Sequence, residues 1–138
     1  MKAPSAADLL SELAVQQALE QAWIDSRVDD PLTRHEEGGW VFLDTTSGGI
    51  VIRRAAAGAQ ASLDLSSPPT VPGAVVIATF HTHPNPSADG WEPGPSAADM
   101  QSAWRFGVPC IIRADDGIHT TGPDSRRGGL SDGPGYPP

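Results

Sequence analysis

The spacing of apolar residues predicts a helix at the start of the chain. Ser5 and Asp8 form a capping-type start, and apolar side chains then recur at helical spacing. We therefore expect one amphipathic helix from Ser5 to Ser26, and Pro31 prevents its continuation. The recurring positions are Val15, Ala18, Leu19, Ala22 and Trp23.

The middle of the chain has the patterns of strands. Trp40 to Leu43 and Ile50 to Ile52 flank the turn-prone segment Thr46 to Gly49, which predicts a hairpin. Ala61 to Leu65 is a candidate third strand. Val75 to Phe80 is continuously apolar, as expected for a central strand that is buried on both faces.

A loop and a second helix follow. Prolines and glycines in Asn85 to Pro95 favour a loop without regular structure. Ser96 then caps a helix that reaches Phe106, and Gly107 and Pro109 mark its end. The side chains expected to face inward are Met100, Ala103 and Trp104.

Two further strands are predicted, at Cys110 to Arg113 and at Ile118 to Thr121. From residue 122 to residue 138 the chain has almost nothing to bury, and a loosely ordered tail is expected. Residues 1–121 should thus form a single α/β domain, with a mixed, curved sheet and helices on both of its faces.

Composition limits the classes of function. The 138 residues suffice for one domain, and the net charge of −8 comes with no run of Lys or Arg, so a nucleic-acid partner is not expected. No stretch approaches the roughly 18 apolar residues of a membrane span, and the N-terminus lacks a basic region followed by an apolar one, so we expect a cytoplasmic protein. Cys110, the only cysteine, has apolar neighbours and is interpreted as a core residue rather than a nucleophile.

Candidate chemistry is concentrated around His81 and His83. Two histidines at i and i+2 on an extended backbone point to the same side, so both rings can reach one metal ion. With Asp99 as a third ligand they form the usual catalytic zinc set, which leaves one position open for water. Glu36 or Glu37 could then take a proton from that water.

These residues carry a resemblance to the JAMM metalloproteases, also called the JAB or MPN-domain family. The shared pattern is a glutamate, an apolar strand ending in His-x-His-Pro, and Ser-x-x-Asp at the start of a helix, and it covers roughly residues 36–112. The resemblance implies an MPN-like fold, Zn²⁺ bound by His81, His83 and Asp99, and stabilisation of the tetrahedral intermediate by Ser96. It also implies that Glu36 is the general acid and base, because Glu36 has the family's spacing to the following glycine and strand.

Several assignments have alternatives. Segment Asn85 to Pro95 is longer than is usual in the family, so Asp89 is a rival ligand to Asp99, and Trp91 is a candidate substrate contact. Ser96 and Asp99 are also what a plain capped helix requires. For His35 and His119 we expect no catalytic role: His35 should be exposed, and His119 should lie on a surface strand or turn. The Gly-Gly at the end of Arg126 to Gly129 is interpreted as coincidence.

The expected activity is zinc-dependent hydrolysis of a peptide or isopeptide bond. What the resemblance implies as substrate is a peptide or protein tail, such as a ubiquitin-like tail ending in Gly-Gly or a sulfur-carrier protein; bacterial and phage conflict systems are a further setting. One alternative is a non-catalytic scaffold of the same fold. Another is a different metal-dependent hydrolase, although a zinc deaminase would need Cys-x-x-Cys and a phosphoesterase would need a basic clamp.

Overall fold

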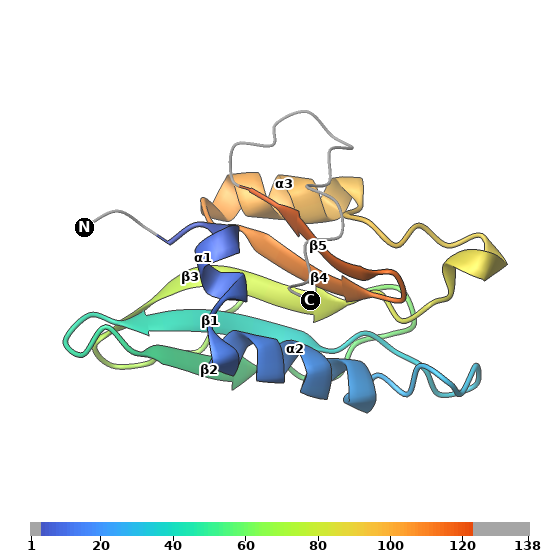
Figure 1. Ribbon diagram of the computed structural model, residues 1–138, viewed down its shortest axis with the longest axis horizontal. Coiled ribbons are helices and arrows are strands. Elements are labelled where there is room, and N and C mark those ends of the chain that lie inside the picture. The colour runs from blue at the N-terminus through green and yellow to red at the C-terminus, as the bar shows by residue number, and fades with distance from the viewer. Residues whose placement is uncertain (1–3, 123–138) are drawn as a thin grey trace.

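The computed structural model describes residues 4–122, which form a five-stranded sheet with helices on both faces (Figure 1). The helices are α1 (Ala6–Leu10), α2 (Leu13–Asp25), the short 3-10 helix η1 (Ser87–Asp89) and α3 (Ala97–Phe106). The strands are β1 (Gly38–Asp44), β2 (Ile50–Arg54), β3 (Ala74–Thr82), β4 (Cys110–Ala114) and β5 (Gly117–Thr121).

The sheet is mixed, with strand order β2-β1-β3-β4-β5. Strands β3 and β4 are parallel and connected through α3, while the other neighbours are antiparallel. The α/β class, the hairpin, the last two strands and the central place of β3 were all predicted correctly. Burial of β3 was predicted too broadly, because Val75 is 51% exposed and the strand is continuously buried only from Ile77 onward.

The N-terminal segment forms two helices where the sequence predicted one. The side chain of Ser11 turns back to donate a hydrogen bond to the carbonyl of Asp8 at 2.6 Å, and the backbone N–H of Glu12 bonds the carbonyl of Leu9. Serine competes in this way with the regular helical bonds, so α1 ends at Leu10. The break lets α1 and α2 both place leucines in the core.

Alternation along β4 separates the two faces of the sheet. Ile111 belongs to the main hydrophobic cluster, which also contains Leu9 of α1 and Leu19 of α2. Its neighbours Cys110 and Ile112 point the other way and pack with Ala103 of α3. The N-terminal helices therefore cover one face and α3 the other, as the sequence predicted (Figure 1).

Three local predictions were wrong. Segment Ala61 to Leu65 is not a strand, because its groups bond elsewhere: the Leu65 carbonyl accepts from the Trp40 indole, and Asp64 binds Ser66 in a turn. The predicted loop before α3 contains the turn of η1. Trp104 is 50% exposed, so its side chain does not face inward as those of Met100 and Ala103 do.

The predicted tail, including Arg126 to Gly129, lies outside the described residues apart from position 122. Among residues 4–122, no helix has the length and apolar character that a membrane span requires.

Gly38 is the closest point of contact between β1 and β3. A Cβ atom at this position would overlap the Phe80 carbonyl oxygen and lie 2.8 Å from Cα and Cβ of His81. We expect Gly38→Ala to lower the free energy of unfolding by about 1–3 kcal/mol, because the strands must separate to admit the methyl group. Urea unfolding of the two proteins measures this difference.

Gly49→Ala is the matched control. A Cβ atom there meets only the Ser47 hydroxyl, at 3.1 Å, so the change should stay within about 0.5 kcal/mol. Equal stability of the two variants would contradict the proposed strand contact.

Candidate metal centre

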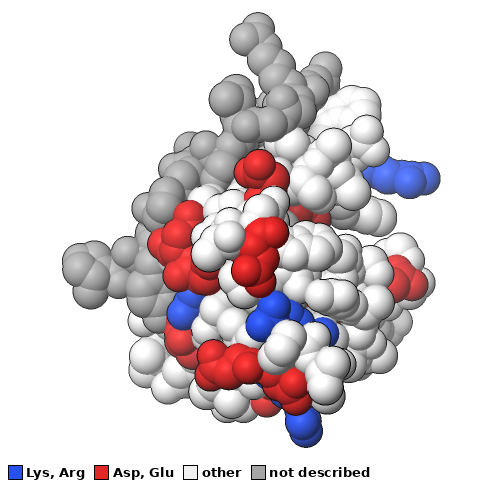
Figure 2. Space-filling view, turned by 90° about the vertical axis from the view of Figure 1, so that its right-hand side faces the viewer, with Lys and Arg blue, Asp and Glu red and all other residues white. Residues whose placement is uncertain are grey.

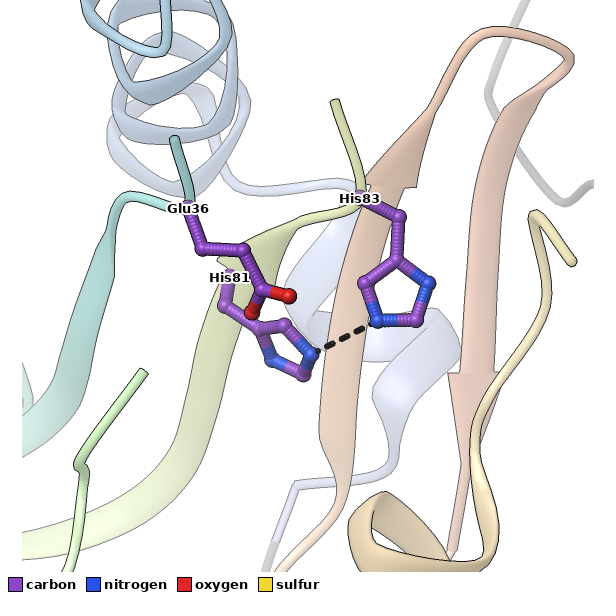
Figure 3. Close-up of side chains that lie close together, drawn as sticks. All are labelled: Glu36, His81 and His83. Carbon is purple, nitrogen blue, oxygen red and sulfur yellow. Dashed lines mark hydrogen bonds between the residues drawn. The ribbon is translucent and has the colours of Figure 1, made fainter. Parts of the chain in front are cut away.

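The register of β1 against β3 brings Glu36 to the two histidines. Gly38 pairs with His81, and the backbone N–H of Thr82 bonds the carbonyl of Glu37, so the antiparallel order continues one residue beyond the strand. Side chains alternate between faces, which leaves Glu36, His81 and His83 on the same face. Their ligand atoms all lie within 4.8 Å of one another (Figure 3).

Each histidine ring is oriented through its second nitrogen. Nδ1 of His83 lies 3.2 Å from the carbonyl oxygen of Pro93, which can only accept, so Nδ1 carries the proton and Nε2 has a free lone pair. Nδ1 of His81 lies 3.6 Å from the Cys110 sulfur. Outer partners of this kind fix the ring orientation of metal-binding histidines.

Asp99 meets both rings at their free nitrogens. Its Oδ1 lies 3.2 Å from Nε2 of His81, and its Oδ2 lies 3.2 Å from Nε2 of His83. The two Nε2 atoms are themselves 3.1 Å apart. Nitrogen lone pairs that face one another at this distance require a proton or a cation between them.

The spacing fits a zinc ion. Four ligand atoms at about 2.0 Å in tetrahedral directions lie about 3.3 Å from each other. The two Nε2 atoms are 3.1 Å apart, and each lies 3.2 Å from an oxygen of Asp99, Oδ1 for His81 and Oδ2 for His83. These separations are close to that value, so His81, His83 and Asp99 could hold a zinc ion.

Asp99 takes part both in the N-terminal cap of α3 and in the contact with the histidines. Ser96 is the N-cap of α3: its hydroxyl accepts from the Asp99 N–H at 3.1 Å, and Asp99 Oδ2 accepts from the Ser96 N–H at 2.8 Å. The capping box expected from the sequence is thus present. Because it fixes Asp99 at the first turn of α3, the same bonds aim the carboxylate at the histidines, and the hydroxyl proton of Ser96 is not used by the cap.

The two glutamates differ in their surroundings. Glu37 is held by two partners, with Oε1 2.7 Å from Nη2 of Arg54 and Oε2 2.5 Å from Nε2 of His35. Glu36 instead points towards the ring of His81 (Figure 3). The structure therefore brings Glu36 to the site and directs Glu37 away from it.

The charges at the site influence one another strongly. Burial raises the pKa of Glu36; His81 and His83 oppose this shift, and Asp99 adds to it. Burial by itself raises the pKa of Asp99, but the charges and hydrogen bonds of the two histidines outweigh it and hold the pKa well below its ordinary value. Burial by itself lowers the pKa of His81. Asp99 and Cys110 outweigh this effect and raise the pKa well above its usual range. In the metal-free protein a proton on His81 thus compensates the negative charge of Asp99, and a divalent cation could take the place of that proton.

The site opens into a groove of about 1220 Å³. Its lining includes Leu63 and Leu65, from the segment that was expected to be a strand, and Trp91 and Phe106. Trp91 is 43% exposed, which leaves its ring available to a bound molecule. The charged lining residues that the structure describes are all acidic, apart from the histidines: Glu36, Asp64, Glu92 and Asp99.

Other candidate residues lie elsewhere or have a different role. Asp89 is exposed in η1, whereas Asp99 contacts both histidines. His35 is only partly exposed, because it bonds Glu37. His119 is buried, contrary to expectation: it lies across Ile112 from His81 in the sheet and bonds Asp116 at 2.7 Å.

Sequence reasoning missed the contact between Cys110 and His81. Cys110 is buried as predicted, but it lies on the site face of β4. The sequence holds no signal for this contact, since it depends on the parallel register of β3 and β4, which pairs Thr79 with Cys110.

Comparisons of the chain with protein-family models, with curated proteins and with solved structures give no match. The chemistry of the site has to be inferred from its own atoms.

The different partners of the two glutamates predict different effects on stability. Glu37→Gln should lower the free energy of unfolding by about 1–2 kcal/mol, because Arg54 loses one of its two ionic partners. Asp25 remains, and the partial exposure of Arg54 keeps the loss below the ~3–5 kcal/mol of a fully buried pair. Glu36→Gln is the matched control and should be neutral or stabilising, because a buried amide costs less than a buried carboxylate. Urea unfolding with a chelator present measures both, and a larger loss for Glu36→Gln would contradict this assignment.

Proposed function

We propose that the protein is a zinc-dependent peptidase or isopeptidase of the JAMM type, with an MPN-like fold. The observation that carries this proposal is the convergence of His81 Nε2, His83 Nε2 and the Asp99 carboxylate, with Glu36 beside them, at the base of an open groove. A site with three such ligands has an open position, which is typical of catalytic rather than structural zinc.

Bound zinc supplies Lewis-acid chemistry, which lowers the pKa of water towards neutrality and polarises a carbonyl group. Glu36 is the proton carrier in this proposal: its carboxylate accepts a proton from the attacking water and later delivers it to the departing amine. The raised pKa of Glu36 suits this role, since a group that both accepts and donates works best near the ambient pH.

Ser96 and Trp91 have supporting roles. The hydroxyl proton of Ser96 is not used by the helix cap, so it can be donated to the oxygen of the tetrahedral intermediate, a contact worth about 3 kcal/mol in similar sites. Trp91 and the leucines that line the groove offer apolar contact to an extended peptide.

The charge of the groove favours a peptide over a phosphoester. Its described lining contains no Lys or Arg to hold a phosphate group, and its carboxylates repel anions. Figure 2 shows the end of the molecule where β3 finishes, with acidic side chains in several patches and basic side chains in separate, smaller ones. This pattern supports a neutral or basic tail as the substrate, for instance a ubiquitin-like or sulfur-carrier tail, and it gives nucleic acid no basic track.

Measurements of metal content and turnover on single variants should distinguish the proposed metal ligands from the proposed base, Glu36. Wild-type protein is expected to hold one zinc ion per chain, His81→Ala and Asp99→Asn to lose both metal and turnover, and Glu36→Ala to keep the metal while turnover falls by about 10²–10⁴-fold. Elemental analysis after dialysis and a cleavage assay measure the two quantities. Full turnover in Glu36→Ala with none in Glu37→Ala would overturn the choice of base.

A panel of substrates tests the reaction class. The zinc-loaded protein should cleave Gly-Gly-linked isopeptides or linear fusions and leave an aryl phosphate intact, and Trp91→Ala should raise KM for the peptide without loss of zinc. Phosphate release with no peptide cleavage would favour a different metal-dependent hydrolase. Stoichiometric zinc with no turnover of either substrate would favour the non-catalytic scaffold.

A further inference from the structure

A chain of buried hydrogen bonds connects the end of α2 to the segment that carries Glu36. The N–H of Glu37 donates to the Thr82 hydroxyl at 3.1 Å, that hydroxyl lies 2.6 Å from the Ser26 hydroxyl, and Ser26 donates to the Ala22 carbonyl at 2.8 Å. Ser26 and Thr82 are both fully buried, at 0% exposure. The connected residues come from three parts of the sequence.

The number of hydroxyl protons decides which group donates in each of these hydrogen bonds. Ser26 has one hydroxyl proton and gives it to the Ala22 carbonyl, so towards Thr82 it can only accept. Thr82 therefore donates to Ser26 and accepts from the Glu37 N–H. Each of the two hydroxyls then both donates and accepts, and the Ala22 carbonyl accepts from the hydroxyl and the backbone N–H of Ser26, so no polar group of the series is left unpaired.

This series of hydrogen bonds lies at the point where the pairing of β1 and β3 ends. The paired residues of β1 and β3 end at Gly38 and His81, and beyond this point the Thr82 backbone N–H holds the Glu37 carbonyl at 2.9 Å. The Thr82 hydroxyl holds the N–H of the same residue. Thr82 thus holds both the N–H and the carbonyl of Glu37 by hydrogen bonds, and Glu36 is the preceding residue in the chain.

We propose that Thr82 is a positioning residue for Glu36, and that Ser26 anchors Thr82 to α2. Thr82 lies between the two histidines in sequence, but its hydroxyl faces α2. The same strand end therefore carries the two rings on one face and holds the backbone of Glu37, the residue next to Glu36, from the other. This inference rests on the proposed function. A displacement of about 1 Å between reacting groups can lower a rate about 100-fold, so the grip matters for turnover more than for metal binding.

The test compares four variants of the full chain. Thr82→Val removes the hydroxyl and keeps the shape of the side chain, Thr82→Ser restores the hydroxyl, and Ser26→Ala removes only the anchor. Thr121→Val is the matched control, because Thr121 is also fully buried and its hydroxyl has no hydrogen-bond partner among the described residues. Zinc content, kcat, KM and amide exchange of Glu37 are measured for each.

Thr82→Val should keep its zinc and its KM, lose about tenfold or more in kcat, and exchange the Glu37 amide proton faster. Thr82→Ser should restore both quantities, and Thr121→Val should match the wild type. Ser26→Ala should change kcat in the same direction by less, and a wild-type kcat for Ser26→Ala would remove Ser26 from the proposal.

A kcat for Thr82→Val within about twofold of the control, or a fall in kcat that follows loss of zinc, would overturn the positioning role. If the wild type hydrolyses nothing, the proposed function fails by itself. The exchange of the Glu37 amide then still decides whether Thr82 holds the segment, and an unchanged exchange rate in Thr82→Val would overturn that grip.

Discussion

The pairing of Gly38 with His81 is the contact on which the site depends. At this point β1 lies so close to β3 that no side chain fits at position 38. The absence of a side chain leaves room for the Phe80 carbonyl and for Cα and Cβ of His81, and the register at this point carries Glu36 to the same face as His81. A slip of one residue would turn Glu37 to that face and Glu36 to the other.

Groups around the candidate metal centre hold its side chains in place. The Pro93 carbonyl and the Cys110 sulfur hold the outer nitrogens of the two rings, and the cap of α3 fixes Asp99. Two inner nitrogens and a carboxylate are then forced together in a buried place, which is costly unless a positive charge joins them. The Pro93 carbonyl comes from the long segment between β3 and α3.

Much of the fold followed from signals that act over a few residues. The capping box of α3, the glycine that ends it and the turn of the first hairpin are local hydrogen-bonding features, and they appear where the sequence predicted them. The errors were made where local signals competed with tertiary contacts: the Ser11 break, the unpaired Ala61 to Leu65 segment and the outward Trp104.

By itself the sequence determined that His81 and His83 share a face, because alternation along a strand needs no knowledge of the rest of the chain. It also determined the capped start of α3. Only the tertiary structure brought Asp99 to the histidines, separated Glu36 from Glu37, and joined Thr82 to the end of α2. These contacts link residues that are far apart in the sequence, and their geometry is set by strand register and helix packing, which no short segment specifies.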